Sequence, residues 1–555
     1  MAYAPQDPVR AALWDGLVQA IGHQQWPIPE AMTLTPPPQE EQGDYATNAA
    51  LLLARELRQP PMEIAQRLAT ALDRRSLGLA SVEVAPPGFI NLRLLPQTFT
   101  SALPGVLAKG EAYGQVDLGQ GERINVEFVS ANPTGDLHVG HARWAAVGDS
   151  LCNLLAFAGY DVTREYYIND AGRQIDLMAD SLEARYRQLL GQSAEIPPDG
   201  YHGEDLRALA QELIDRQGDV LLAEDPHVRH DFFKAWGLQR KMAVIREDLE
   251  ALGVHFDVWF SERSLYEGKE VEAALDQLRR RGALYEQDQA VWLRTTAYGD
   301  DKDRVVIKSD GSYTYFAPDI AYHRNKLERG YDRLIDIFGA DHHGYVPRLR
   351  AAIAALGYDA QRLEVLIGQV VRLFQDGQEV KMSKRTGRLV TLRELTELVG
   401  KESARYFLTM RSINTALDFD LDLARTQSNA NPVYYVQYAH ARIASLLRQA
   451  EQSGETFHAS QADWSLLGEG NALAVVKAVL TYPDVIAEAA RARAPHRLNA
   501  YLYELAGVFH AFYNQNRILG QALPLTQARL GLSILVGQIL RSGLRILGIT
   551  APEQM

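Results

Sequence analysis

The fold is decided by residues 123–141, RINVEFVSANPTGDLHVGH. Apolar and polar side chains alternate over residues 123–129, which predicts a β-strand. Residues 130–135 contain Asn, Pro and Gly and predict a turn. Apolar residues then recur at helical spacing over residues 147–158, and Gly159 follows as a stop signal. A strand, a Gly-containing turn and an amphipathic helix in this order are typical of a doubly wound parallel sheet, so we predict a Rossmann-like α/β domain.

The motif His138-Val-Gly-His141 stands where the predicted helix begins. Free backbone N–H groups and the positive end of the helix dipole favour an anion there, and two imidazoles add hydrogen-bond donors for phosphate oxygens. Gly140 leaves space for a flat base to approach. A pair of structural histidines that cap backbone groups would explain this short motif equally well. A nucleotide site is therefore a hypothesis that needs a second motif.

That second motif is Lys381-Met-Ser-Lys-Arg385, in a polar stretch between Gly377 and Gly387 that predicts a mobile loop. Transfer of an adenylyl group needs positive charge where pyrophosphate leaves, and Lys381 and Lys384 can supply it when the loop closes. A solvated basic loop is the alternative explanation for this second motif taken alone. The two motifs together, in this order, favour nucleotide chemistry.

The chain has 555 residues, more than one hydrophobic core supports, so several domains are expected. We predict an N-terminal α+β module (residues 1–100), an α/β domain (115–430) with a charged helical insertion (173–257), and an all-helical domain (431–555). Apolar spacing around Ile443 and Leu535 supports the last of these. The patterns also predict helices over 45–57 and 345–356, and strands over 81–84, 89–94, 162–168, 305–307, 333–338 and 364–367.

Charge is distributed unevenly along the chain. The formal net charge is -13, but residues 431–555 contain 10 Lys and Arg against 8 Asp and Glu, net +2, which leaves about -15 on residues 1–430. This balance argues against a nucleic-acid binder that relies on overall attraction. It allows a polyanion to be positioned locally on the C-terminal part.

Cysteine usage and the N-terminus restrict the class of protein further. Cys152 is the single cysteine of the sequence, which excludes an internal disulfide and a cysteine-based zinc site, so we expect no structural zinc. The first residues carry no basic leader with an apolar core, and no uncharged stretch reaches the length of a membrane span. We expect a cytoplasmic protein that does not enter a membrane.

The two motifs together resemble the nucleotide-binding motifs of class I aminoacyl-tRNA synthetases. The surrounding sequence is similar to the arginyl-tRNA synthetase family over nearly the whole chain, through residues 126–141, 166–172 (YYINDAG), 259–264 (WFSERS), 315–319 (YFAPD) and 339–344 (GADHHG). The resemblance implies an enzyme that activates L-arginine with ATP and Mg²⁺ to arginyl adenylate, releases pyrophosphate, and transfers arginine to the terminal ribose of tRNA(Arg). It also implies a monomer in which bound tRNA precedes activation.

The resemblance assigns site residues position by position. His138, His141, Lys381 and Lys384 are the expected catalytic residues. ATP is expected to bind these four together with Gly140, Asp341, Met382 and Ser383. Arginine is expected to bind Glu127, Ser130, Asn132, His141, Glu262, Tyr315, Asp319 and His343, with acceptors in Glu262, Tyr315 and Asp319 for the planar guanidinium. Some relatives carry glutamine at position 343, and many have a degraded lysine loop that is complete here.

Contact with tRNA is expected at both ends of the chain. The resemblance implies that the N-terminal module meets the outer corner of the tRNA and that the helical C-terminal domain binds the anticodon. In residues 431–442, Tyr434 and Tyr438 with Arg442 are of the types that stack on unpaired bases. Packing within the helical domain explains the same aromatic face.

Three other classes of protein remain open from the sequence. A small-molecule adenylyltransferase uses a similar histidine motif but would keep its turnover without residues 431–555. A non-catalytic tRNA-binding relative would lack ATP-dependent activity. A synthetase for another amino acid is the nearest alternative, with lysine as the physical competitor, although lysine lacks the planar fork that two carboxylates can address.

Overall fold

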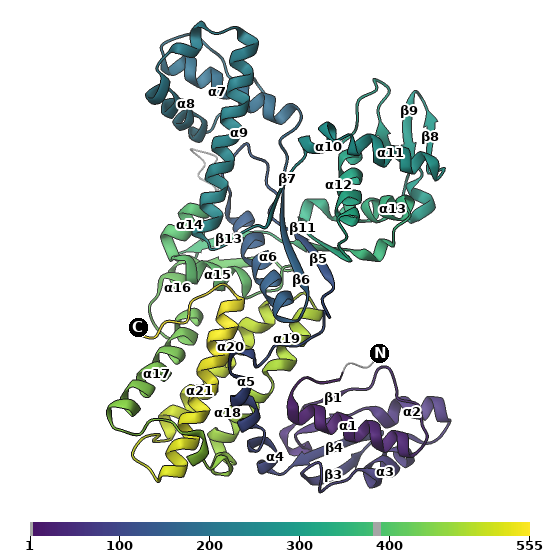
Figure 1. Ribbon diagram of the computed structural model, residues 1–555, viewed down its shortest axis with the longest axis vertical. Helices are drawn as coiled ribbons and strands as arrows, with labels where there is room; N and C mark the ends of the chain where they lie inside the picture. The colour runs from purple at the N-terminus through teal and green to yellow at the C-terminus, as the bar shows by residue number, and fades with distance from the viewer. Residues whose placement is uncertain (1–3, 381–389) are drawn as a thin grey trace.

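The computed structural model describes residues 4–380 and 390–555, apart from the side chains of Glu40, Asp341 and His343. Figure 1 shows the N-terminal module at the lower right, joined to the rest of the molecule through α4 (Pro96–Thr100) and α5 (Leu103–Lys109). Its antiparallel sheet has the order β1-β2-β4-β3. The module consists of α1 (Pro8–His23), β1 (Leu34–Thr35), β2 (Tyr45–Thr47), α2 (Ala49–Leu57), α3 (Pro61–Ala71), β3 (Leu79–Ala85) and β4 (Phe89–Leu94).

One prediction in this module is wrong in part. The helix expected over residues 45–57 begins only at Ala49, because Tyr45–Thr47 is strand β2 and pairs with β4. Pairing with a strand more than 40 residues later overrides the local helical pattern. The strands predicted over 81–84 and 89–94 are confirmed as β3 and β4.

The centre of the molecule is a five-stranded, all-parallel sheet of order β12-β11-β5-β6-β7. From β5 the chain passes through α6 (Val139–Phe157) to β6 on one side. From β11 it passes through α13 (Val346–Leu356) to β12 on the other side, so the direction of winding reverses between β5 and β11. This is the doubly wound sheet predicted from the sequence. Its strands are β5 (Arg123–Glu127), β6 (Asp161–Ile168), β7 (Val258–Ser261), β11 (Arg333–Gly339) and β12 (Leu363–Gly368).

Between β6 and β7 the chain forms the lobe at the upper left of Figure 1, which is helical as predicted. It contains α7 (Arg173–Leu189), α8 (Glu204–Gln217) and α9 (Pro226–Ala251). The three helices enclose a core of their own, with Leu182, Leu206 and Phe233 buried in it.

A second lobe, at the upper right, lies between β7 and β11. The strand predicted over 305–307 is confirmed as β10, which belongs to a separate antiparallel sheet of order β10-β9-β8 and not to the parallel sheet. Strand periodicity cannot tell which sheet a strand joins. The two-residue turn at Asp288 and Gln289, both with positive φ, closes the β8–β9 hairpin without the Asn-Gly signal of such turns. The lobe consists of α10 (Arg263–Glu267), α11 (Glu270–Arg280), β8 (Leu284–Gln287), β9 (Ala290–Leu293), β10 (Arg304–Ile307) and α12 (Phe316–Glu328).

The rest of the chain lies beside and below the sheet in Figure 1 and is mainly helical. A small sheet of order β14-β13-β15 and three helices come first: β13 (Val371–Gln375), β14 (Gln378–Glu379), α14 (Leu392–Val399), α15 (Lys401–Thr409), β15 (Leu417–Asp420) and α16 (Leu421–Arg425). From residue 431 all regular elements are helices, as predicted: α17 (Pro432–Gln452), α18 (Gly470–Leu480), α19 (Tyr482–Arg491), α20 (His496–Gln515) and α21 (Leu523–Ile546).

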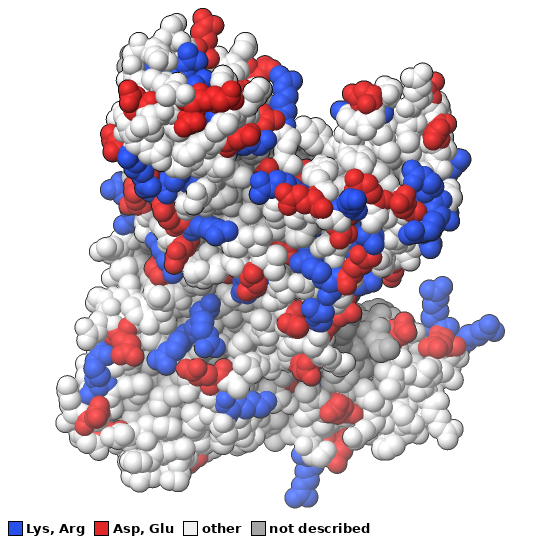
Figure 2. All heavy atoms as spheres, turned by 45° about the horizontal axis from the view of Figure 1, so that its top comes forward, with Lys and Arg blue, Asp and Glu red and all other residues white. Residues whose placement is uncertain are grey.

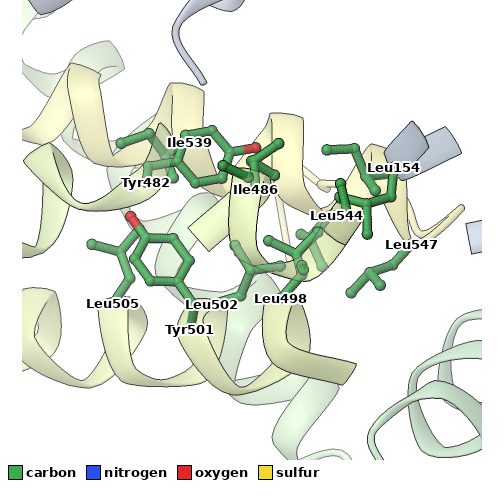
Figure 3. Packing of buried hydrophobic residues seen from close by; sticks show 14 of the residues in the cluster. Leu154, Tyr482, Ile486, Leu498, Tyr501, Leu502, Leu505, Ile539, Leu544 and Leu547 are labelled. Atoms are coloured by element: carbon green, nitrogen blue, oxygen red, sulfur yellow. The ribbon is translucent and has the colours of Figure 1, made fainter. Parts of the chain in front are cut away.

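Helix α6 connects the parallel sheet to this helical domain. Figure 3 shows Leu154 of α6 beside Leu544 and Leu547 at the end of α21. The Ser150 hydroxyl of α6 donates to the carbonyl of Leu547 at 3.3 Å, so a hydrogen bond joins the two helices beside the apolar contact. In the described part of the chain, α21 is the one helix long and apolar enough to cross a membrane, but 67% of its apolar window is buried inside the protein. Its apolar residues therefore form the core of the bundle.

Candidate active site

A cavity of about 660 Å³ opens above the carboxyl ends of β5 and β11, where the winding of the sheet reverses. Ligands of doubly wound sheets bind at this position. Figure 2 shows the surface hollowed between the two upper lobes, with acidic and basic side chains intermixed on both. The cavity brings together each expected arginine or ATP ligand that contributes a described side chain: Glu127, Ser130, Asn132, His138, His141, Glu262, Tyr315 and Asp319.

The two histidines cap the start of α6. Nδ1 of His138 accepts from the backbone N–H of Gly140 at 3.1 Å, and Nδ1 of His141 accepts from the N–H of His138 at 3.2 Å. Their rings stack with centroids 3.7 Å apart. Burial lowers the pKa of His141 to about 3 and lowers the pKa of His138 as well. Both imidazoles are therefore neutral near pH 7, and because Nδ1 accepts in each, Nε2 carries the proton.

Capping and nucleotide binding are consequently not alternatives here. The Nδ1 atoms cap the backbone, which leaves the Nε2–H groups as donors on rings that line the cavity. A Cβ added at Gly140 would lie 2.9 Å from Cε1 of His138, so glycine is needed for the cap itself. The sequence had suggested only that Gly140 makes room for a base.

The turn after β5 is strained. Val129 and Ser130 have φ of 67° and 39°, a region that residues with a side chain seldom adopt. Such strain costs about 1–3 kcal/mol per residue and is concentrated at functional sites. It directs the Ser130 hydroxyl back under the turn, where it donates to Oε1 of Glu127 at 2.9 Å and accepts from the N–H of Tyr167 at 3.1 Å.

Two carboxylates with raised pKa values face the cavity. Burial raises the pKa of Glu262 to about 7, against the hydrogen bond from the Tyr266 hydroxyl at 3.2 Å, and neighbouring Asp319 raises it further. Burial also raises the pKa of Asp319 to about 6, although the Tyr345 hydroxyl donates to its Oδ2. The amide nitrogen of Asn169 lies 3.1 Å from Oε2 of Glu262 when its side chain is oriented as a donor. A bound cation would stabilise the ionised form of both carboxylates and lower their pKa values.

Glu127 lies deeper and already has a cationic partner. Nζ of the fully buried Lys326 donates to Oε2 of Glu127 at 2.5 Å and to Oδ1 of Asp336 at 2.9 Å. Ring nitrogens of His323 lie 2.8 Å from Oδ2 of Asp336 and 2.7 Å from the carbonyl of Asp319. Both partners are acceptors, so His323 is an imidazolium with two donors. These charges fix α12, which carries Asp319, to the parallel sheet.

The same network sets the protonation of its members. Burial alone would lower the pKa of His323, but Asp336 outweighs it and raises that pKa. Burial would raise the pKa of Asp336, and Lys326 with His323 holds it at about 2 instead. Asp336 and His323 are therefore both charged near pH 7 and stabilise each other as a buried ion pair.

The remaining expected ligands differ in how the structure places them. Tyr315 precedes α12 at the rim of the cavity with 79% of its surface exposed, four residues before Asp319. Asn132 is exposed, and its amide donates to Gln174 at 2.9 Å. Lys381, Met382, Ser383 and Lys384 lie outside the described residues. Asp341 and His343 belong to the turn η5 (Ala340–Tyr345) after β11, and their side chains are likewise not described.

The expected tRNA-binding residues lie on α17, far from the cavity along the chain. Tyr434 and Tyr438 stack with ring centroids 6.2 Å apart. The Arg442 guanidinium lies 4.8 Å from the Tyr438 ring and 4.7 Å from the Tyr513 ring, and it hydrogen-bonds His510 at 3.1 Å. The arginine therefore takes part in packing between α17 and α20.

Several cavity residues were not anticipated from the sequence. Tyr345 follows the GADHHG stretch directly, and Tyr167 and Asn169 lie inside the YYINDAG stretch, so both stretches carried a usable signal. Lys326 and His323 sit in an ordinary helical pattern, and their charged roles arise only from contacts across the sheet.

Comparison with known proteins places this site in a class. Residues 102–427, which include the parallel sheet and the cavity, match the family model described as tRNA synthetases class I (R), catalytic domain. Residues 10–94 match the arginyl tRNA synthetase N terminal domain, and residues 436–555 match the DALR anticodon binding domain. The fold and the site thus define a class I aminoacyl-tRNA synthetase.

Individual relatives narrow the class to a family. An arginine–tRNA ligase of Geobacillus kaustophilus is 52% identical over 529 residues, covering 95% of each chain. One of Bacillus licheniformis is 49% identical over 551 residues, covering 99% of each. The Thermus thermophilus arginyl-tRNA synthetase has the same fold, with a TM-score of 0.77 at 24% identity over 98% of this chain and 99% of that one. This chain belongs to the arginyl-tRNA synthetase family, as the resemblance had predicted.

Proposed function

We propose that the β5/β11 cavity is the site of both steps of the chain's reaction: the chain activates L-arginine with ATP, releases pyrophosphate, and transfers arginine to the terminal ribose of tRNA(Arg). The observation that carries this proposal is that two carboxylates, the buried Glu262 and the half-buried Asp319, line the same cavity; both have raised pKa values. A guanidinium presents several N–H donors in one plane and can address both. Lysine offers a point charge and would leave part of this acceptor set unpaired, which disfavours it.

The other arginine ligands follow from their positions around the cavity. Tyr315 at the rim supplies a hydroxyl for the guanidinium, and we assign Asn132 and His343 to the main-chain groups of the amino acid. Ser130 and Glu127 act mainly by shaping the floor, because the hydroxyl of Ser130 is bonded to Glu127 and the carboxylate of Glu127 is neutralised by Lys326.

ATP binds in the proposal at the start of α6. The Nε2–H groups of His138 and His141 donate to phosphate oxygens without adding positive charge, because both rings are neutral. The arginine carboxylate attacks the α-phosphorus, and Lys381 and Lys384 neutralise the leaving pyrophosphate, with Met382 and Ser383 beside them. Asp341, at the end of β11, is assigned to the ribose.

Mg²⁺ enters with ATP. Among the residues that the structure describes there is no group of three His, Cys, Asp or Glu side chains that could hold a metal. We therefore assign the ion to phosphate oxygens and water, a common mode for Mg²⁺ with nucleotide substrates.

The tRNA and the cellular setting complete the proposal. The module of residues 1–100 meets the outer corner of tRNA(Arg), and residues 431–555 bind the anticodon, with Tyr434, Tyr438 and Arg442 as candidate contacts. Residues 115–430 form the catalytic domain, with its insertion at 173–257. The protein acts as a monomer in the cytoplasm, away from the membrane.

The test is ATP–pyrophosphate exchange with each amino acid in turn, with and without tRNA(Arg). Exchange with arginine and not with lysine supports the carboxylate pocket, and exchange that requires tRNA supports coupled activation. The matched variants Asp319→Asn and Asp310→Asn separate the pocket from charge in general, because Asp310 is an exposed acid in a turn of the same lobe. Activity with another amino acid, or equal activity of both variants, contradicts the arginine pocket. No exchange with any amino acid favours a non-catalytic protein.

A further inference from the structure

Helix α9 belongs to two hydrophobic cores. Its 26 residues span about 39 Å. Phe233 in its first half is buried in the core of the insertion, whereas Ile245 and Leu249 in its second half are buried in the main core. Figure 1 shows the helix running from the upper-left lobe down to α14. A single unbroken helix therefore links the insertion rigidly to the region of the active site.

Lys241 stands near the middle of α9 and is 2% exposed. Its Nζ donates to Oδ1 of Asp136 at 3.2 Å and also contacts Asp205 in the first turn of α8. Asp136 lies two residues before His138 in the turn that leads into α6. A buried lysine costs free energy unless it is paired, so Asp136 and Asp205 stabilise the buried ammonium group. Through Asp136, Lys241 also fixes the position of the turn before α6.

That turn is bonded directly to residues 390–392, the first described residues after 381–389. The N–H of Leu392 donates to the carbonyl of Leu137 at 2.7 Å, and the N–H of Val139 donates to the carbonyl of Val390 at 3.1 Å, so His138 and Thr391 form an antiparallel bridge. Two backbone hydrogen bonds thus join the histidine motif to the start of α14.

Helix α9 also holds α14. Nε of Arg393 donates to Oδ1 of the buried Asp248 at 2.7 Å. Asp248 follows Lys241 by seven residues, 248 minus 241, which places both on one face of α9 two turns apart. One face of α9 therefore contacts both segments that the bridge joins, the turn at Asp136 and the start of α14.

The geometry assigns to Lys241 the role of a positioning residue for ATP: through Asp136 it fixes the turn that orients the capping histidines, so the insertion sets the shape of the nucleotide site. This inference rests on the proposed arginine activation. In the proposed function, the guanidinium of arginine binds on the other side of the cavity, to Glu262 at the start of α10 and Asp319 of α12. The loss of Lys241 should therefore weaken ATP binding more than arginine binding.

The test compares Lys241→Met with Arg240→Met in arginine-dependent ATP–pyrophosphate exchange. Arg240 is the neighbouring residue of α9 and pairs with Glu212 of α8 at 3.1 Å, so its replacement removes an ion pair between the same two helices without touching the turn. For Lys241→Met we expect kcat/KM for ATP to fall about 10- to 100-fold, the effect of a displacement of roughly 1 Å, with KM for arginine within about twofold. Arg240→Met should leave both values within about twofold of the native chain.

Asp136→Asn tests the same contact from the other partner, and it serves if Lys241→Met does not fold. It should show the same selective loss for ATP, and the double variant should be no worse than Lys241→Met alone, because both changes break one link. Equal losses for ATP and arginine, or values for Lys241→Met and Asp136→Asn that match those of Arg240→Met, overturn the inference. A native chain that fails to exchange with arginine overturns the proposed function instead.

Discussion

Arginine binding should release protons from the pocket below pH 7. With pKa values of about 7 for Glu262 and about 6 for Asp319, the empty pocket holds about one proton at pH 6.5 and about 0.1 at pH 8. A guanidinium within about 4–6 Å lowers a carboxyl pKa by roughly 1–3 units, so binding expels these protons. Affinity for arginine should accordingly fall as pH falls, by roughly 20-fold between pH 8 and pH 6.

Isothermal titration calorimetry in buffers of different ionisation enthalpy measures this release directly, because the observed binding enthalpy then depends on the buffer. The native chain should show a buffer dependence equal to about one proton at pH 6.5 and almost none at pH 8. Glu262→Gln removes the group with the higher pKa and should leave roughly a quarter of a proton at pH 6.5. Buffer-independent enthalpies at pH 6.5, or an unchanged release in Glu262→Gln, would refute the assignment of the two carboxylates.

Three further predictions concern stability and the histidine cap. Glu262→Gln should stabilise the empty protein by about 3 kcal/mol above pH 7 and by nothing below pH 4.5, because the raised pKa makes the native state prefer the proton; melting temperatures at pH 8 and pH 4.5 check the sign. Lys326→Met should cost about 3–5 kcal/mol because it leaves Glu127 and Asp336 buried without a cation, measured as urea resistance of the catalytic region. Gly140→Ala should displace the His138 ring and raise KM for ATP about tenfold while arginine affinity stays within about twofold, which equilibrium binding of each substrate can distinguish.

The sequence predicted the parts of the fold that depend on local pattern. The β5–α6 unit, the strands β5, β6, β11 and β12 of the parallel sheet and the helical C-terminal region follow from periodicity, and the structure contains each of them. Strand β7 was not predicted, and the sheet that β10 joins could not be, because periodicity does not encode which strand is the partner. Strand β2 was missed because pairing with β4 outweighs helix propensity.

The sequence predicted which residues line the site, but not which ion pairs those residues form. Glu127 reads as a ligand in the sequence, but its partner Lys326 lies 199 residues away, and no local pattern connects them. The positive φ of Val129 and Ser130 gives no signal in a sequence either, because both residues usually avoid it. The roles of Lys381 and Lys384 remain predictions, since they lie outside the described residues.

The packing of α6 against the helical domain limits where this chain can be truncated. Ser150, Asn153 and Leu154 of α6 all contact the end of α21, and the fully buried Arg405 joins Asp149 to the carbonyl of Leu547. A chain shortened at residue 430 would expose this face of the helix whose first turn holds the histidines. Loss of activity in such a chain would therefore reflect the loss of packing against α6 as well as the loss of tRNA contact. Chimeras between relatives should exchange α6 and the helical domain together.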